Sequence, residues 1–396
     1  MYSDKLDRNV FKRIGGGKIM YSDKLTRNLF RRIVSFALGL AVVFVSGAMA
    51  AEAPVFEGLS SGERARVQEL IAGAEKEGDV VMLTNTMGPD VAQPLFEDFQ
   101  SFYGLKNVQL RHTMKRSGSV ISTLKQDISA GRNTFDIIQV GSPAFMLELF
   151  HRNALMKYES PNYQNFVPEV TGLKPGAVAV PGYFISGQVL TFGIVSNTKF
   201  VKKDIKTWED VLDPKYKGKI IVADILKSAT IVNIYGGLRT VLPKSYFEKL
   251  AKQDPIFVLS HREIVRKIVA GEKWIGVMNS TNLAYKAAKD GAPLKAILPP
   301  GGTVALGYPL AILAKAPHPD AAKLWIDYLH SSRGYMRYLN AKGFTSGLKN
   351  AEVSPLIRSF SPPVEALEII PMDWDKIGPK QVKDWRAEYK KIFYKE

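Results

Sequence analysis

Apolar runs of strand length alternate with amphipathic stretches of helical period from residue 78 onward. The run GDVVMLTNT (78–86) predicts a strand, and VAQPLFEDFQSFY (91–103) predicts the helix that follows it. The same pattern continues with strands over 107–114 and 135–142 and helices over 121–131 and 143–153. Such alternation is typical of α/β layering around a mainly parallel sheet.

The alternation restarts after residue 215 and predicts a second α/β lobe. Its strands are expected over 217–224, 256–260 and 273–280, and its helices over 229–237, 245–253, 262–271 and 283–291. Two long β-rich segments, VLTFGIVSNT (189–198) and TVALGYPLAILA (303–314), are bounded by Gly or Pro. We expect these segments to be the two crossovers that connect the lobes, and we expect a cleft between the lobes. The predicted limits are 51–190 completed by 308–345 for lobe 1, and 191–307 for lobe 2, on which a C-terminal tail (346–396) packs.

The first fifty residues have the pattern of a secretory signal peptide. Lys24, Arg27, Arg31 and Arg32 precede an apolar stretch, and Ala48-Met49-Ala50 places small residues at a cleavage site. MYSDKLDRNVFKRI (1–14) is nearly repeated as MYSDKLTRNLFRRI (20–33), which indicates a duplicated start with Met20 as the functional one. We therefore expect cleavage after Ala50 and a periplasmic location. An uncleaved membrane anchor is the alternative, because the apolar stretch approaches spanning length.

Composition excludes several kinds of function. The chain has 396 residues, enough for two lobes, and no cysteine, which excludes disulfides, thiolate catalysis and cysteine-bound metals. The net charge is +16, and it falls to +10 once residues 1–50 are removed. The remaining bases are scattered among acids, which argues against nucleic-acid binding. We expect a monomer with neither a cofactor nor a bound metal.

Two stretches resemble the bacterial extracellular solute-binding proteins of the type 2 periplasmic class, particularly the branch with the ferric-ion-binding proteins. IVSNTKFVKKDIKTWEDVLDPKYKGKI (194–220) is similar to that family's strand, Asn-Thr turn and Trp-x-Asp segment. AKAPHPDAAKLWIDYLHSSRGYMRYLNAKGF (314–344) is similar to its Ala-Pro-His-Pro helix start. The resemblance implies an α/β, two-lobed type 2 periplasmic binding protein fold. It also implies a receptor that gives a small ligand to the membrane permease of an ABC importer.

In such a fold the ligand lies where strand carboxyl ends and helix N-termini converge. Those loops hold hydroxyls, amides and bases, with Asp224 as the one acid nearby. The candidate ligand-binding residues are Asn85, Thr86, Arg116, Ser117, Ser142, Lys227, Ser228, Thr230, Asn279, Thr281, Asn282 and Tyr308. Backbone N–H groups, hydroxyls and guanidinium groups all bind anions. We therefore expect a small organic anion: a carboxylate, a phosphonate or a sugar phosphate. Helix capping and surface bases would account for the same residue types.

Two other functions are weighed against this one. Ferric receptors of the resembled branch use adjacent tyrosines where this chain has residues 279–283 without a tyrosine, and Tyr285 is expected inside a helix. Amides and hydroxyls do not supply the anionic oxygens that Fe³⁺ needs. An enzyme on the same fold is the second alternative. Gly58-Leu59-Ser60-Ser61-Gly62 matches the hydrolase elbow, but no strand is expected before it.

Overall fold

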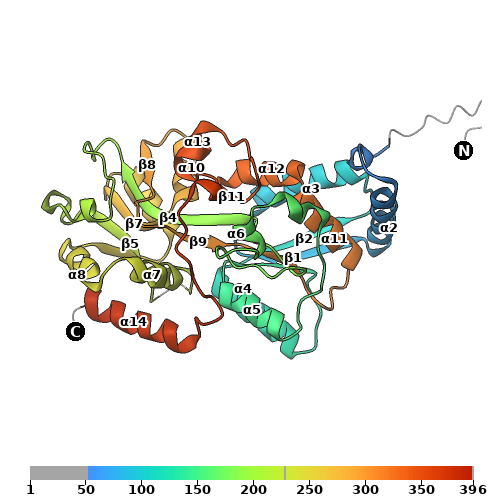
Figure 1. Ribbon diagram of the computed structural model, residues 1–396, viewed down its shortest axis with the longest axis horizontal. Helices are drawn as coiled ribbons and strands as arrows, with labels where there is room; N and C mark the ends of the chain where they lie inside the picture. The colour runs from blue at the N-terminus through green and yellow to red at the C-terminus, as the bar shows by residue number, and fades with distance from the viewer. Residues whose placement is uncertain (1–51, 227–228, 395–396) are drawn as a thin grey trace, which may run out of the picture. The chain divides into compact units, whose positions relative to one another are not determined.

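Two separate β-sheets organise the computed structural model, which describes residues 52–226 and 229–394 (Figure 1). One sheet has four strands in the order β10-β3-β1-β2. The other has seven, in the order β11-β4-β7-β5-β6, with β8 and β9 also paired to β4. We call each sheet with the helices around it a lobe, the four-stranded one first. The prediction of a two-lobed α/β fold is confirmed, whereas the expected signal peptide lies outside the described residues.

The first lobe is built mainly from the N-terminal half of the described chain. Its strands are β1 (Asp79–Thr84), β2 (Gln109–Met114), β3 (Ile137–Gln139) and β10 (Leu310–Ile312). Its helices are α2 (Ser61–Glu77), α3 (Pro89–Tyr103), α4 (Ser117–Ser129), α5 (Pro143–His151), α6 (Pro168–Thr171), α11 (Pro319–His330) and α12 (Ser332–Lys342), with the short 3₁₀ turns η1 (Pro54–Phe56) and η2 (Pro161–Asn165). β1 runs parallel to β2 and β3, and β10 is antiparallel to β3. In the core Phe99 of α3 packs against Trp325 and Tyr328 of α11, with ring centroids 5.1 and 5.6 Å apart.

The second lobe is centred on β4 (Gln188–Asn197), all ten residues of which are buried. Its other strands are β5 (Ile220–Ala223), β6 (Ile256–Val258), β7 (Ile275–Ser280), β8 (Leu294–Ile297), β9 (Val304–Gly307) and β11 (Thr345–Ser346). Its helices are α7 (Ala229–Val241), α8 (Lys244–Lys252), α9 (His261–Val269), α10 (Thr281–Lys289), α13 (Pro355–Phe360) and α14 (Pro379–Phe393), with the 3₁₀ turns η3 (Glu209–Leu212), η4 (Pro214–Tyr216) and η5 (Val364–Ala366). A continuous apolar run such as β4 is expected for a strand that is covered on both faces.

Of the two segments predicted as crossovers, the second passes from one sheet to the other, and the first does not. β9 pairs with β4 in the larger sheet, and β10 pairs with β3 in the smaller one, so the chain changes sheets at Tyr308 and Pro309. In contrast, β4 lies wholly in the larger sheet, because β7, β8, β9 and β11 pair along its length. The first change of sheet therefore comes before residue 188, ahead of the predicted segment 189–198. The residue limits of the lobes stay a prediction.

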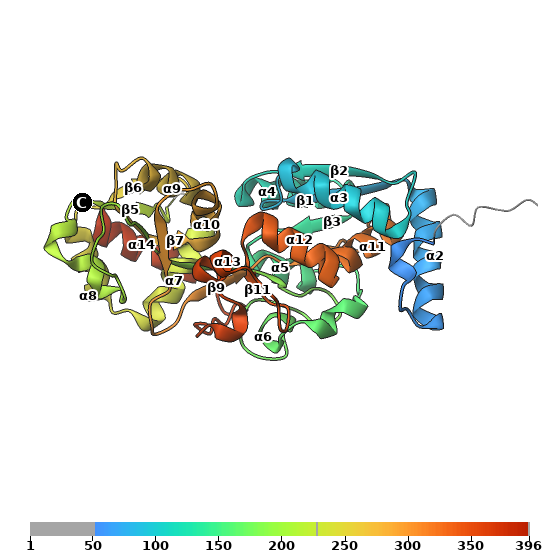
Figure 2. The same ribbon diagram turned by 90° about the horizontal axis from the view of Figure 1, so that it is seen from above.

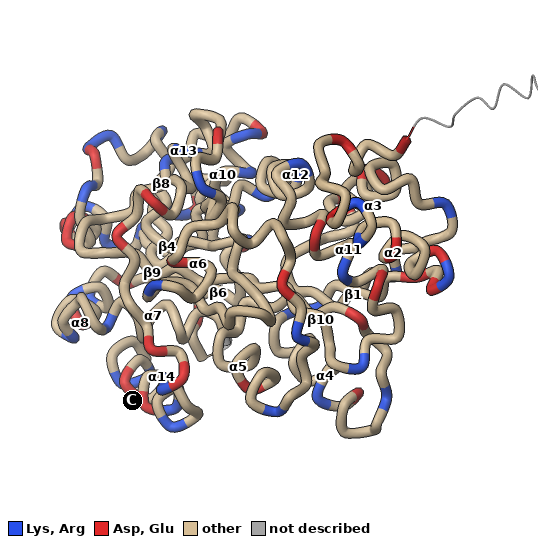
Figure 3. The backbone as a smooth tube through the Cα atoms, turned by 45° about the vertical axis from the view of Figure 1, so that its right-hand side comes forward, with Lys and Arg blue, Asp and Glu red and all other residues tan. Residues whose placement is uncertain are grey.

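The C-terminal helix packs on the second lobe, beside α7 and α8 (Figure 1). Tyr389 of α14 is fully buried with its ring 5.4 Å from that of Tyr235, and Glu388 accepts a hydrogen bond of 2.7 Å from Arg239. Lys and Arg are interspersed with Asp and Glu along the backbone of both lobes (Figure 3). Among the described residues, no helix is both long and apolar enough to cross a membrane.

Candidate functional site

A cavity of about 870 Å³ is lined by residues of both lobes. We call it the first cavity. From the first lobe it is lined by Asn85, Met114, Lys115, Arg116, Ser117, Gly118 and Tyr308, and from the second by Thr230, Ile231, Leu259, Ser260, His261, Arg262 and Leu283. Most of these residues lie where a strand ends or a helix begins. This is where ligands bind in open α/β sheets.

Three helices present their N-terminal turns to the first cavity. They are α4, which begins at Ser117, α7, which begins at Ala229, and α9, which begins at His261. The first turn of a helix has backbone N–H groups without partners and a partial positive charge, so it attracts anions. At α4 no side chain caps these groups, since the residue at the N-cap position is Arg116. At α9 the Ser260 hydroxyl accepts from one of these groups, the backbone N–H of Glu263. Three helix N-termini at one cavity favour a negatively charged ligand.

The charged side chains of the first cavity are all basic. Lys115, Arg116 and Arg262 line it, and no Asp or Glu is among its described lining residues. The amine of Lys115 donates to the Thr123 hydroxyl at 3.0 Å. The side chains of Arg116 and Arg262 are exposed and make no hydrogen bond or ion pair with another described residue. Asp224, the acid expected nearby, instead accepts from the backbone N–H of Leu226 at 2.8 Å.

Asn85 and Ser117 form the polar floor of the cavity on the first-lobe side. The Asn85 amide donates to the Ser117 hydroxyl at 2.7 Å and accepts from the Gly141 backbone N–H at 3.3 Å. The Ser117 hydroxyl also lies 3.5 Å from the hydroxyl of Thr230 in the second lobe. Residues that the sequence predicted from two separate loops therefore meet across the lobes at this point.

Tyr308 contributes an aromatic wall. Its ring lies so close to Gly141 that a Cβ added there would be 2.3 Å from the Tyr308 Cζ atom, which requires glycine at that position. Burial raises the pKa of the Tyr308 hydroxyl, so the side chain stays neutral at physiological pH. Neutral Tyr308 can donate a hydrogen bond to a ligand without adding charge.

His261 is a cavity residue that the sequence analysis missed. Its Nδ1 atom lies 3.1 Å from Oδ1 of the fully buried Asn279, and its shielded Nε2 atom has no partner among the described residues. Burial lowers the pKa of His261 to about 4, so the ring is neutral at physiological pH. Next to Asn279, Met278 has a left-handed φ of 56°, an uncommon conformation for a residue other than glycine. His261 and Arg262 directly follow the predicted strand 256–260, and residues after a strand end are expected at the ligand site. The sequence therefore contained a signal for them.

Several candidates from the sequence lie outside the first cavity. The Thr86 carbonyl accepts from the Lys342 amine at 2.7 Å, and Thr281 shares hydrogen bonds with Thr191 and Ser361. The Asn282 amide donates to the carbonyl of Lys342 at 3.2 Å. Ser142 is at the N-cap position of α5 but does not cap it. These residues, together with Asn279, are absent from the lining of the first cavity, and Lys227 and Ser228 lie outside the described residues.

Tyr285 is directed away from the first cavity, as expected. It lies within α10, and its hydroxyl donates to the carbonyl of Asn340 at 3.4 Å. Its ring packs over Gly343 and is 6.4 Å from that of Phe360. Tyr285, the tyrosine nearest to residues 279–283, therefore serves packing here.

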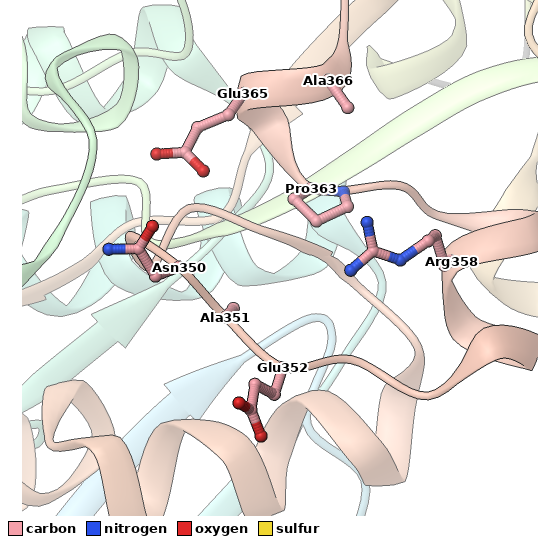
Figure 4. Close-up of a pocket in the computed structure, with 7 residues that line it drawn as sticks. All are labelled: Asn350, Ala351, Glu352, Arg358, Pro363, Glu365 and Ala366. Atoms are coloured by element: carbon pink, nitrogen blue, oxygen red, sulfur yellow. The ribbon is translucent and has the colours of Figure 1, made fainter.

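A smaller depression of about 330 Å³ lies on the C-terminal segment (Figure 4). Its lining residues all come from one stretch, residues 350–366, and they mix Glu352 and Glu365 with Arg358. In Figure 4 the carboxylate of Glu365 extends toward Asn350, whereas Glu352 points away from it. The first cavity is lined by residues of both lobes, and its described charged side chains are all basic. This depression has neither property.

Comparison with known families identifies the class of protein. The sequence model of the family described as bacterial extracellular solute-binding protein matches residues 132–362, more than half of the chain. The chain therefore belongs to this family, and the resemblance inferred from the two sequence stretches is confirmed. The matched region includes Thr230, His261 and Tyr308 of the first cavity.

Individual relatives agree with this class. An uncharacterized protein of Haemophilus influenzae is 28% identical over 232 residues, which are 53% of this chain and 64% of that protein. The periplasmic binding protein AfuA of Actinobacillus pleuropneumoniae, solved with fructose-6-phosphate bound, is 21% identical and superposes with a TM-score of 0.64, covering 80% of this chain and 99% of its own. A ferric binding protein of Campylobacter jejuni is 17% identical with a TM-score of 0.61, covering 79% and 99%. These structures share the fold, while their ligands differ.

Proposed function

We propose that this protein is the periplasmic receptor of an ABC importer and that it captures a small organic anion by closure of its two lobes. The ligand classes that we propose are a carboxylate, a phosphonate or a sugar phosphate. The observation that carries the proposal is the first cavity, in which three helix N-termini and three bases meet, with no acid among the described lining residues.

Charge decides between anionic and cationic ligands. A polyamine at this cavity would face Lys115, Arg116 and Arg262, with no carboxylate among the described lining residues to neutralise it. Leaving buried charges unpaired costs several kcal/mol. Fe³⁺ needs anionic oxygen ligands, and Tyr285 is engaged with Asn340. An anion, in contrast, would gain charge-assisted hydrogen bonds from Arg116 and Arg262.

We propose lobe closure because both lobes contribute residues that can contact the ligand. Arg116 and Ser117 belong to the first lobe, and Thr230 and Arg262 to the second. A ligand favours the closed state only by the contacts that it makes there and not in the open state. Contacts from both lobes meet this condition. X-ray scattering with and without ligand should therefore show a smaller radius of gyration in the bound protein, and a bound protein of unchanged radius would contradict closure.

A thermal-shift screen of acids, amines and Fe³⁺ tests the ligand class on protein purified without ligand. Acids should stabilise the protein, by about 2.7 kcal/mol at a hundredfold excess over Kd. Arg116→Ala should abolish this stabilisation and leave the unliganded protein folded. The matched control is Arg111→Ala, which removes the same charge from an exposed ion pair with Asp79. Stabilisation by amines or Fe³⁺ alone would overturn the anion proposal.

The same hits test the alternative of an enzyme. A receptor returns its ligand chemically unchanged, so each hit incubated with the protein should be recovered intact by mass spectrometry. The Ser60 hydroxyl of the elbow-like sequence caps α2 by accepting from the Glu63 backbone N–H at 3.3 Å. This hydrogen bond supports a structural role for that motif. Turnover of a hit would favour the enzyme.

The proposed location is tested by expression of the chain with its leader in a Gram-negative host. We expect the protein in the periplasmic fraction with Ala51 or a close neighbour as its first residue. Full-length protein in the membrane fraction would instead support the uncleaved anchor. Loss of uptake of the identified ligand in a strain without the protein would support the importer.

A further inference from the structure

A second cavity of about 590 Å³ adjoins the first. Met114, Arg262 and Leu283 line both cavities, so the two share a wall. The rest of the second cavity is formed by the start of α3, one side of α9 and α10, and the end of α12. Figure 2 shows α10 beside α12, where the two lobes meet.

The second cavity contains an excess of bases over acids. Arg262, Arg266, Lys286 and Lys342 line it, together with Asp90 and Asp290. Lys286 and Asp90 pair across the lobes at 3.5 Å with both side chains mostly exposed. Exposed pairs of this kind hold their partners weakly. The guanidinium groups of Arg262 and Arg266 make no hydrogen bond or ion pair with another described residue, and the charge of Arg266 is felt at Glu272, beyond the end of α9.

Lys342 is the least solvated of these bases. Its amine donates to the carbonyl of Thr86 at 2.7 Å. Its pKa is lowered to about 8, mainly by burial; Asp90 acts in the opposite direction, and Lys286 and Arg262 contribute to the lowering. The nearby acid does not compensate for the bases and for the lost hydration. A further negative charge at this place would be stabilised.

We propose that the ligand of this receptor carries a second anionic group, which binds in the second cavity between Lys342 and Arg266. The first anionic group binds at Arg116 and the helix N-termini of the first cavity, so this inference rests on the proposed function. Arg262, which lines both cavities, contacts both groups. The receptor therefore selects elongated acids with a charge at each end over acids with one.

Pairs of acids of equal chain length test this selection. The probes are alkanoates against α,ω-alkanedioates, and alkylphosphonates against α,ω-alkanediphosphonates, with Kd measured by calorimetry. At the best length the two-headed acid should bind roughly 10- to 100-fold more tightly, the range of one added charge-assisted contact. In Arg266→Gln and Lys342→Met this ratio should fall toward one. Lys289→Met, an exposed base of α10 outside both cavities, is the matched control and should keep the ratio.

Proton uptake gives an independent readout at pH 8. A second anionic group beside Lys342 should raise the pKa of that amine from about 8, so binding should take up a fraction of a proton. Calorimetry in two buffers of different ionisation enthalpy measures this uptake. The difference between wild type and Lys342→Met cancels protons that belong to the ligand. We expect uptake with two-headed acids, none with one-headed acids and none in Lys342→Met.

The outcomes separate the two proposals. If one-headed and two-headed acids bind equally, or Lys342→Met leaves the ratio unchanged, the second anionic site is wrong while the anion receptor stands. If neither form of either head group binds and the thermal-shift screen also finds no acid, both proposals fail. Tighter binding of ω-amino acids than of two-headed acids would assign the second cavity to a cation held by Asp90 and Asp290.

Discussion

Arg66 and Arg116 belong to the same lobe, but their surroundings differ. Arg66 lies on α2, where its guanidinium donates to the carboxylate of Asp327 at 2.8 Å and to the Tyr158 hydroxyl at 2.9 Å. Glu63 on the same helix accepts from it at 2.9 Å. The Tyr158 hydroxyl also donates to Asp327 at 2.8 Å. This cluster joins α2 to α11 by bonds that are made within the protein.

Arg116 has no such side-chain partners in the part of the chain that the structure describes. It precedes α4 at an open cavity whose described lining contains no acid. Its charge is therefore available to a molecule from outside. The comparison separates bases that are paired with internal acids and hold the fold together from the bases around the first cavity that we propose for ligand binding.

Asp327→Ala should have the largest effect, and it should fall on stability. Asp327 is 2% exposed, and its removal leaves the charge of Arg66 and the hydroxyl of Tyr158 without their shared acceptor. Breaking a buried pair in this way costs about 3 kcal/mol or more. Urea unfolding followed by tryptophan fluorescence measures the loss, and the Kd of the identified acid should stay within about twofold.

The control for this substitution is Asp373→Ala, which breaks an exposed pair with Lys376 and should change the unfolding free energy by less than about 0.5 kcal/mol. A loss below about 1 kcal/mol in Asp327→Ala would contradict a stabilising role for the Arg66 cluster.

Arg262→Ala should affect binding and leave stability unchanged. Loss of one charge-assisted hydrogen bond weakens binding by about 1.5–3 kcal/mol, or roughly 10- to 100-fold in Kd. The unfolding free energy should change by no more than about 0.5 kcal/mol, since Arg262 has no internal partner to lose. A double-mutant cycle with Arg116→Ala should show coupling, because both lobes must hold the ligand for closure. If Arg262→Ala lowers the unfolding free energy but leaves the affinity unchanged, Arg262 would have a structural role and not a binding role.

Thr230→Val should have a smaller effect on the same region. It keeps the shape of the side chain but removes the hydroxyl that lies 3.5 Å from Ser117 across the lobes. We expect a loss of about 1 kcal/mol in binding, or roughly fivefold. The control is Thr240→Val on the same helix, whose hydroxyl donates to the Gly237 carbonyl away from the cavity. Equal affinity losses in both variants would point to a general effect on α7.

The smallest effect concerns two histidines with the same lowered pKa. Burial lowers the pKa of both His261 and His330 to about 4. In the unfolded chain each takes up its proton near pH 6.5, so below that pH the unfolded state binds more protons and stability falls toward pH 4. An anion in the first cavity should raise the pKa of His261 by roughly half a unit. His330, whose Nδ1 is bonded to the Ile326 carbonyl in the core, should not respond. NMR titration of the two rings with and without ligand measures both values, and equal shifts would contradict the placement of the site.

Much of the fold could be predicted because its signals are local. The strand predicted over 78–86 contains β1, and the helix predicted over 91–103 lies within α3. The first crossover was placed too late, because the apolar pattern of 189–198 does not show which strands pair with it. β4 is committed to the larger sheet by partners as distant as β11, near residue 345.

The candidate site was predicted in part. The loops that follow β1 and β2 supplied Asn85, Arg116 and Ser117, and the loop before α7 supplied Thr230. The loop after β7 was chosen by the same rule, but Thr281 and Asn282 are covered by Ser361 and by the end of α12. That covering comes from segments at least 60 residues away. The residue types at positions 279–282 therefore do not show that these side chains are covered.

The sequence by itself determined the elements, the family and the absence of cysteine chemistry, because periodicity and short motifs are properties of neighbouring residues. Only the tertiary structure decided which bases are free to bind. Arg66 is paired with Asp327, a residue 261 positions away, while Arg116 meets no acid among the described residues that line its cavity. A charge is paired or unpaired according to what lies within a few ångströms of it, and folding brings those neighbours together from distant parts of the chain.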